Sequence, residues 1–279
     1  MNQAPQVVKG TSELKQRVLA GIVMASVAIS VTVFGGWPFA VVWLGASLAV
    51  AYEWQRLVHK DENSIPVFLA IVAVVLAVGG AFWPVPVVLV SSLALIVLAG
   101  FIVEKGSRAA TSVGVAYAAC FGAAVLLCRG NDYNGMVVIF WLFAVVWGTD
   151  ILAYFTGRYF GGPKLWPQVS PKKTWSGAIG GLFSGVLLGC LVLFALGVSP
   201  KFPHIILSIA FSVLTQMGDL FESAIKRRYD VKDSGSLIPG HGGFMDRLDG
   251  FIFAAIFAAA VGFARGGLTG VSGGLINWS

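Results

Sequence analysis

Polar residues that could do chemistry occur at helical spacing in an otherwise apolar stretch. Asp219 is followed at offsets of 3, 4 and 7 residues by Glu222, Ser223 and Lys226, so all four share one helix face. A carboxylate in a membrane-spanning helix costs about 2.5 to 3.5 kcal/mol, and those that persist usually face a cavity, a partner or an ion. Asp150 is another such carboxylate. For Asp219 the alternative is a lysine pair that only holds helices together.

Cations, glycines and carboxylates are concentrated just downstream. Taken singly they read as a membrane-surface anchor, a turn and a helix cap. Together they have the chemistry of a site for phosphates and Mg2+, because glycines let backbone N–H groups approach phosphate oxygens, lysine and arginine neutralise phosphate charge, and carboxylates bind the metal. The groups are Lys226-Arg227-Arg228, Lys232-Asp233, Pro239-Gly240-His241-Gly242-Gly243 and Asp246-Arg247-Leu248-Asp249.

A second basic cluster runs from Ser170 through Lys172, Lys173 and Thr174 to Gly177. Serine and threonine near a helix start beside two lysines can form an anion site, because free helix N–H groups supplement the charges. Ordinary helix capping is an equally good explanation of this cluster alone. Two such clusters on one membrane face predict a highly anionic ligand.

The elements that position these residues are predicted to be membrane-spanning helices. Of the 279 residues 57% are hydrophobic and 11% charged, against roughly 25% charged in soluble domains. A spanning helix needs about 20 mostly apolar residues. We expect an all-α, polytopic bundle of about nine spans, near Val18–Gly35, Phe39–Val58, Ile65–Trp83, Val85–Val103, Ala109–Cys128, Gly135–Gly157, Trp175–Val198, His204–Ala224 and Phe251–Ala264.

The distribution of positive charge predicts the orientation. With the amino terminus in the cytoplasm, all of the 19 Lys and Arg residues except Arg129, Lys201 and Arg265 lie in inside segments, as the positive-inside rule requires. The carboxyl terminus then lies outside. We therefore expect a multi-pass protein of the cell (inner) membrane whose polar clusters face the cytoplasm.

Other features limit the classes of protein. The net charge of +6 follows the membrane topology, so nucleic acid is not an expected partner, and three cysteines in apolar stretches indicate neither a disulfide framework nor a zinc site. The short links predict one integral membrane domain, 1–279, with a polar segment at 1–17 and the motifs within 147–250. A glycine every four residues, Gly177 to Gly189, lets another helix approach closely, either inside the bundle or in a homodimer.

The stretch from Ser223 to Asp249, hereafter the signature stretch, resembles the signature of phosphatidate cytidylyltransferases, also called CDP-diacylglycerol synthases, over 27 residues. Asp150, Ala153-Tyr154, Gly157-Arg158 and the Ser170–Thr174 run are also similar to the family, so the likeness covers roughly Trp147 to Gly250. The amino-terminal half supports it through topology alone. Many members have glutamate at the position of Ser176.

The resemblance implies transfer of a cytidylyl group from CTP to phosphatidate in a lipid membrane, with release of pyrophosphate. It also implies Mg2+ as cofactor, often with a monovalent cation such as K+. Asp219 and Asp246 are the implied metal ligands, with Asp249 in reserve. The predicted catalytic residues are Asp219, Asp246 and Lys226, and the predicted substrate-binding residues are Ser170, Lys172, Lys173, Thr174, Ser223, Arg227, Lys232, His241, Gly242, Gly243 and Arg247.

The expected mechanism is in-line attack of a phosphatidate oxygen on the α-phosphorus of CTP, with Mg2+ drawing charge from the triphosphate. The second pKa of a phosphate monoester is about 6, so the nucleophile is already mostly dianionic at neutral pH. No strong base is needed, and His241 is expected to bind substrate instead. The alternatives are a CTP-dependent lipid kinase of the polyprenol type, which would release CDP, and an ion-coupled transporter using Asp150, Asp219 and Glu222 as a relay.

Overall fold

A computed structural model describes residues 9–59, 65–83, 107–235, 237 and 242–278. Eight of the nine predicted apolar runs coincide with long helices, and the fourth, Val85–Val103, lies outside the described residues. The helices are α1 (Lys9–Phe34), α2 (Gly36–His59), α3 (Ile65–Phe82), α5 (Arg108–Arg129), α6 (Tyr133–Phe160), α7 (Trp175–Ala195), α8 (Phe202–Arg228), α9 (Met245–Gly266) and the short α10 (Val271–Ile276). A two-stranded hairpin, β1 (Lys164–Trp166) and β2 (Ser170–Thr174), was not expected from the sequence.

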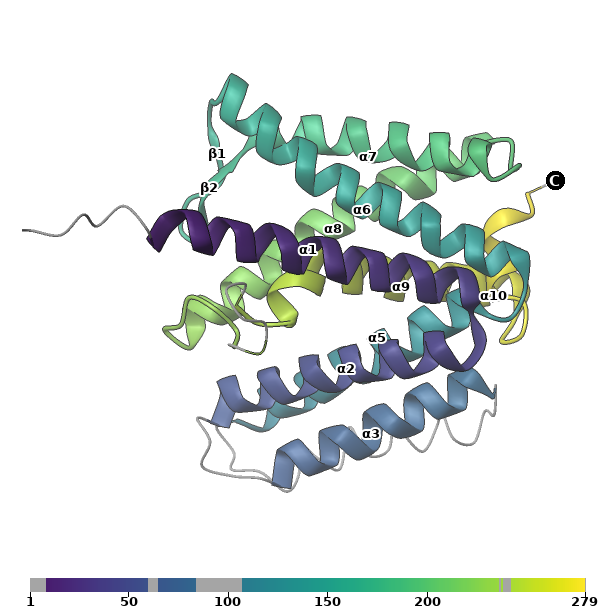
Figure 1. Ribbon diagram of the computed structural model, residues 1–279, viewed down its shortest axis with the longest axis horizontal. Helices are drawn as coiled ribbons and strands as arrows, with labels where there is room; N and C mark the ends of the chain where they lie inside the picture. The colour runs from purple at the N-terminus through teal and green to yellow at the C-terminus, as the bar shows by residue number, and fades with distance from the viewer. Residues whose placement is uncertain (1–8, 60–64, 84–106, 236, 238–241, 279) are drawn as a thin grey trace, which may run out of the picture.

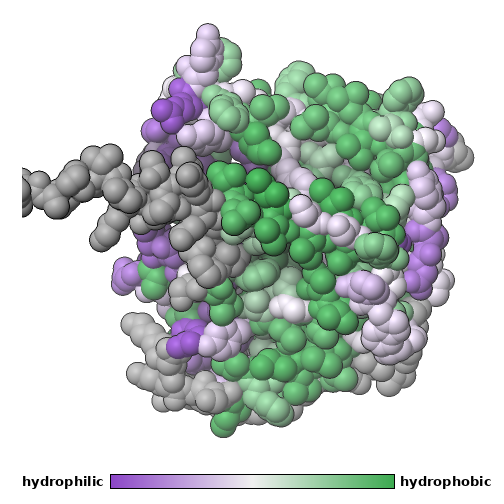
Figure 2. All heavy atoms as spheres, in the orientation of Figure 1, coloured by the Kyte–Doolittle hydropathy of each residue, from purple (hydrophilic) through white to green (hydrophobic). Residues whose placement is uncertain are grey.

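The long helices form a bundle with an apolar outer surface. Six of the described helices, α3 and α5 to α9, are long and apolar enough to cross a membrane. Figure 1 shows the long helices running side by side, with the hairpin and the residues that follow α8 at one end and α10 at the other. Hydrophobic residues form a band across the face in Figure 2, and hydrophilic residues gather at both ends. The chain is therefore a helical, multi-pass membrane protein.

Helix α5 lies at the centre of the bundle, with 72% of its apolar window buried, compared with 28% for α7. Its small residues admit large side chains from neighbouring helices. Trp54 of α2 packs on Gly114, where a Cβ would lie 1.9 Å from the indole, and its Nε1 donates to the carbonyl of Ala110 at 2.9 Å. This contact fixes α2 against α5 near the hairpin end of the bundle.

The glycine stripe of α7 packs against α6. A Cβ on Gly181 would lie 2.7 Å from the carbonyl oxygen of Thr149, and one on Gly189 would lie 2.5 Å from Val145. Both glycines are buried. The stripe is thus used inside the bundle, as the first of its two interpretations predicted, and it provides no argument for a dimer.

Helices α8 and α9 also touch through glycines, at the level of the predicted metal ligands. A Cβ on Gly218 would lie 2.3 Å from the carbonyl oxygen of Asp249, and one on Gly250 would lie 2.7 Å from Thr215. Gly218 directly precedes Asp219, and Gly250 directly follows Asp249. Close packing of the two helices therefore brings both carboxylates to the same end of the bundle.

Candidate active site

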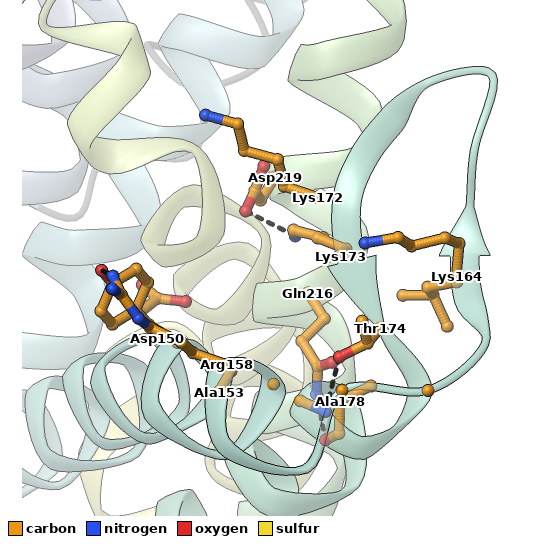
Figure 3. Close-up of a pocket in the computed structure, with 16 residues that line it drawn as sticks. Asp150, Ala153, Arg158, Lys164, Lys172, Lys173, Thr174, Ala178, Gln216 and Asp219 are labelled. Carbon is orange, nitrogen blue, oxygen red and sulfur yellow. Dashed lines mark hydrogen bonds and ion pairs between the residues drawn. The ribbon is translucent and has the colours of Figure 1, made fainter.

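A cavity of about 630 Å³ opens at the hairpin end of the bundle. Helix α6 forms one side, the hairpin and the start of α7 form another, and α8 closes it (Figure 3). Three lysines and two carboxylates face it together with glycines and an amide. The lining includes Asp150, Tyr154, Gly157, Arg158, Gly161, Gly162, Lys164, Lys172, Lys173, Thr174, Gly177, Gln216 and Asp219.

Two glycines turn the chain from α6 into the hairpin. Gly161 and Gly162 have φ values of +60° and +97°, a region that L side chains rarely adopt. The strands then pair in antiparallel fashion, with Lys164 opposite Thr174. The predicted start of the seventh apolar run at Trp175 is confirmed, and the Ser170–Thr174 segment before it, with Lys172 and Lys173, is a strand whose lysines are held at the cavity by backbone pairing.

Helix α7 begins only at Trp175, and Thr174 caps it. The Thr174 hydroxyl oxygen accepts a hydrogen bond from the backbone N–H of Gly177 at 3.1 Å, which satisfies one of the free N–H groups of the first turn. Ser176 donates to the carbonyl of Gly161. Where relatives are expected to carry glutamate, this chain therefore uses a hydroxyl to join the end of α6 to the start of α7.

Lys173 and Asp219 form an ion pair across the cavity, with Nζ and Oδ2 2.5 Å apart (Figure 3). Both side chains stay partly accessible, at 26% and 35% exposure, so ligands can reach them. Lys164 and Lys172 line the same cavity. The structure thus joins the two clusters that the sequence separates by more than 40 residues.

Asp249 lies within electrostatic range of Asp150 and Asp219, and Lys173 offsets part of the negative charge. These carboxylates come from α9, α6 and α8 respectively. Asp150 and Asp219 line the cavity itself, where carboxylates can attract a cation. Among the described residues no three His, Cys, Asp or Glu side chains converge tightly enough to hold a metal ion alone.

Lys226 sits at the centre of a second, more buried cluster. Its Nζ donates to Glu222 Oε2 at 2.8 Å and to Asp246 Oδ1 at 2.6 Å. The other Asp246 oxygen, Oδ2, accepts from the backbone N–H groups of Ser234 at 3.0 Å and Gly243 at 2.9 Å. Asp246 therefore joins the end of α8 to both sides of the connection that leads into α9.

The remaining predicted residues lie around these clusters. Ser223 donates to Asp219 Oδ1 over a long 3.4 Å. Gly242 and Gly243 stand just before α9, where a Cβ on Gly242 would be 2.9 Å from Asp246 Oδ2. Arg227, Lys232 and Arg247 are exposed at this end of the bundle, and His241 lies outside the described residues.

The chain is similar to known proteins over most of its length. A model of the Cytidylyltransferase family matches residues 15–264. The chain belongs to the cytidylyltransferase family. It is similar to proteins named phosphatidate cytidylyltransferase from Brucella abortus biovar 1 (strain 9-941), 37% identical over 88% of this chain and 95% of the relative, and Bacillus subtilis (strain 168), 33% identical over 88% and 96%. A relative of that name from Staphylococcus haemolyticus (strain JCSC1435) is 32% identical over 86% of this chain and 95% of the relative.

The family relationship confirms the resemblance in the signature stretch and extends it into the amino-terminal half. The sequence patterns did not indicate two cavity residues and one buried acid. Lys164 and Gln216 line the cavity, but neither belongs to a recognisable pattern. Glu53 lies in the predicted apolar run Phe39–Val58, and the insertion cost that drew attention to Asp219 would also have indicated it.

The carboxylates of this candidate site suit Mg2+ by their chemistry. Mg2+ prefers oxygen ligands, uses one or two carboxylates and completes its octahedron with water and substrate phosphates. The Asp219 and Asp246 oxygens each accept one or two hydrogen bonds, and a carboxylate offers about four acceptor positions. Both groups can therefore accept a further bond at this end of the bundle.

Proposed function

We propose that the protein is a phosphatidate cytidylyltransferase, which makes CDP-diacylglycerol and pyrophosphate from CTP and phosphatidate. The observation that carries the proposal is a lysine-lined cavity bordered by carboxylates at one polar end of a membrane bundle. The relatives that bear this name match over nearly their full lengths. A membrane location suits a lipid substrate, and the lysines suit two phosphate-bearing ones.

The proposed roles follow from the contacts. Asp219 and Asp246, with Asp249 in reserve, would hold Mg2+, which supplies Lewis-acid stabilisation of charge on the triphosphate when bound. Lys172 and Lys173, on β2, bind a substrate phosphate, and Lys226, on α8, stabilises negative charge on the substrates. The other substrate contacts proposed are Ser170, Thr174, Ser223, Arg227, Lys232, His241, Gly242, Gly243 and Arg247. A monovalent cation such as K+ is a second proposed cofactor.

The nucleophile needs electrostatic help more than a base. Its phosphate is mostly dianionic at neutral pH, so the difficulty is the approach of two anions. Lys164, Lys172 and Lys173 reduce this repulsion at the cavity. Tyr154 is 59% exposed at the cavity and Trp175 54% exposed at the start of α7, and such aromatic rings favour the membrane interface where a phosphatidate headgroup lies.

The reaction can be tested directly. The purified protein is incubated with phosphatidate, Mg2+ and each of the four nucleoside triphosphates in turn. We expect pyrophosphate and CDP-diacylglycerol with CTP alone. Release of CDP with phosphorylation of a lipid alcohol would instead identify a lipid kinase, and transport without turnover would identify a carrier.

For the topology we propose about nine spans, with the amino terminus and active site on the cytoplasmic side of the cell (inner) membrane and the carboxyl terminus outside. Asp233 and Asn131 are both exposed. Asp233 lies in a connection predicted on the cytoplasmic side of the membrane, and Asn131 lies in one predicted on the outer side. In a variant lacking Cys120, Cys128 and Cys190, an impermeant thiol reagent applied to intact cells should label Asn131→Cys. It should label Asp233→Cys only after permeabilisation. The reverse pattern would refute the orientation.

A further inference from the structure

Glu53 of α2 is a buried acid that touches the signature stretch from the other half of the chain. It is 2% exposed. Its Oε1 accepts from the backbone N–H of Phe244 at 2.9 Å, and its Oε2 accepts from the N–H of Met245 at 2.9 Å and from the hydroxyl of Ser234 at 3.2 Å. All three partners are donors, which matches an ionised carboxylate because that group can only accept.

These contacts cap helix α9 from a distance. Phe244 is the N-cap residue of α9, and its own side chain forms no capping bond. The first N–H groups of a helix need external acceptors, and a negative charge there also interacts favourably with the helix dipole. Glu53 supplies both, although it is 191 residues away from Phe244 in the sequence.

The connection between α8 and α9 is packed directly on this carboxylate. A Cβ on Gly235 would lie 2.6 Å from Glu53 Oε1, and one on Gly243 would lie 2.6 Å from Oε2. Ser234 makes two hydrogen bonds: its hydroxyl donates to Glu53 and its backbone N–H donates to Asp246. Glu53 and Asp246 thus fix the two sides of the connection from different helices.

We propose that Glu53 is a positioning residue for the reaction. By capping α9 from the distant helix α2, it sets the position of the first turn of α9, which carries Asp246, relative to Lys226. This inference rests on the proposed function. Glu53 touches none of the groups assigned to the reacting atoms, so it acts through Asp246 and through the backbone of Phe244 and Met245.

The test compares Glu53→Gln with a matched variant on the same helix. Glutamine keeps the shape, but its NH2 group must face a donor, at Phe244 or at Met245, whichever way the amide turns. Gln55→Leu is the control, because Gln55 is equally buried and donates its hydrogen bond to the carbonyl of Thr111 in α5 instead of to the α8–α9 connection. The measurements are kcat, the KM values for CTP and phosphatidate, the thermal midpoint and hydrogen exchange of the 243–246 backbone amides.

For Glu53→Gln we expect kcat to fall about tenfold, equivalent to about 1.4 kcal/mol, with both KM values within about twofold of wild type. Exchange at 243–246 should accelerate about tenfold, and Gln55→Leu should change neither quantity. Wild-type kcat in folded Glu53→Gln, unchanged exchange, or an equal kcat loss in Gln55→Leu would each overturn the proposal. If the wild-type protein released no pyrophosphate, the proposed function would fail, while the exchange measurement would still decide whether Glu53 holds α9.

Discussion

Replacing Asp246 by asparagine tests the centre of the proposed site, because both carboxylate oxygens face donors. Oδ1 accepts from Lys226 at 2.6 Å, and Oδ2 accepts from the N–H groups of Ser234 and Gly243. The asparagine amide has one acceptor oxygen, so its NH2 group must face either the lysine or the two backbone donors. The variant also removes the charge proposed to bind Mg2+.

These contacts set the expected size of the effect. A hydrogen bond to a charged group contributes about 1.5 to 3 kcal/mol, and loss of a key electrostatic stabiliser in an active site costs about 2.7 to 4 kcal/mol. The second effect alone corresponds to a factor of about 100 to 1,000 in rate. We therefore expect kcat of Asp246→Asn to fall by at least about 100-fold, with a weaker apparent affinity for Mg2+.

The assay is pyrophosphate release at saturating CTP and phosphatidate, repeated over a range of Mg2+ concentrations. Asp230→Asn is the matched control, because Asp230 is exposed after α8 and has a φ of +56°, which asparagine also tolerates. It should keep wild-type turnover. A folded Asp246→Asn protein with near-normal turnover and an unchanged Mg2+ requirement would contradict the proposed role of Asp246.

Three further outcomes are expected. The Lys172→Ala, Lys173→Ala double variant should raise the KM for CTP or phosphatidate, lower kcat, or do both, by at least about tenfold, since charged hydrogen bonds contribute about 1.5 to 3 kcal/mol each. The control variant Lys201→Ala, at the other end of the bundle, should show neither change. Wild-type kinetics in the double variant would indicate that the two lysines only anchor the chain at the membrane surface. Gly218→Ala should lower the thermal midpoint and turnover, because its Cβ would lie 2.3 Å from the Asp249 carbonyl oxygen. Gly45→Ala is the control, because a Cβ there would have nothing within 4 Å. Equal losses of thermal midpoint and turnover in the two variants would contradict the close packing of α8 on α9. Chelation with EDTA should abolish turnover and added Mg2+ should restore it, whereas activity that persists in EDTA would exclude the proposed metal role.

Local patterns in the sequence were sufficient to predict the long helices of the described residues and one face of the site. The spacing of Glu222 and Lys226 predicts their neighbourhood on α8 from helical periodicity alone, and the ion contact at 2.8 Å agrees. The hairpin could not be predicted in this way, because strands of three and five residues with adjacent lysines show no alternation of polar and apolar residues. Contacts such as Glu53 to Phe244 depend on how distant helices pack, and the sequence carries no local sign of that packing.

Two lysines of the site are already paired with carboxylates within the protein. Lys173 pairs with Asp219, and Lys226 pairs with Glu222 and Asp246. Under the proposed function, Asp219 and Asp246 are the groups that would bind Mg2+, so the lysines and the metal share the same partners. A lysine that exchanges its carboxylate for a substrate phosphate keeps a negative neighbour, and the carboxylate that it leaves regains full capacity for the cation. Loading of metal and nucleotide should therefore be mutually favourable, because each relieves a charge that the other exposes.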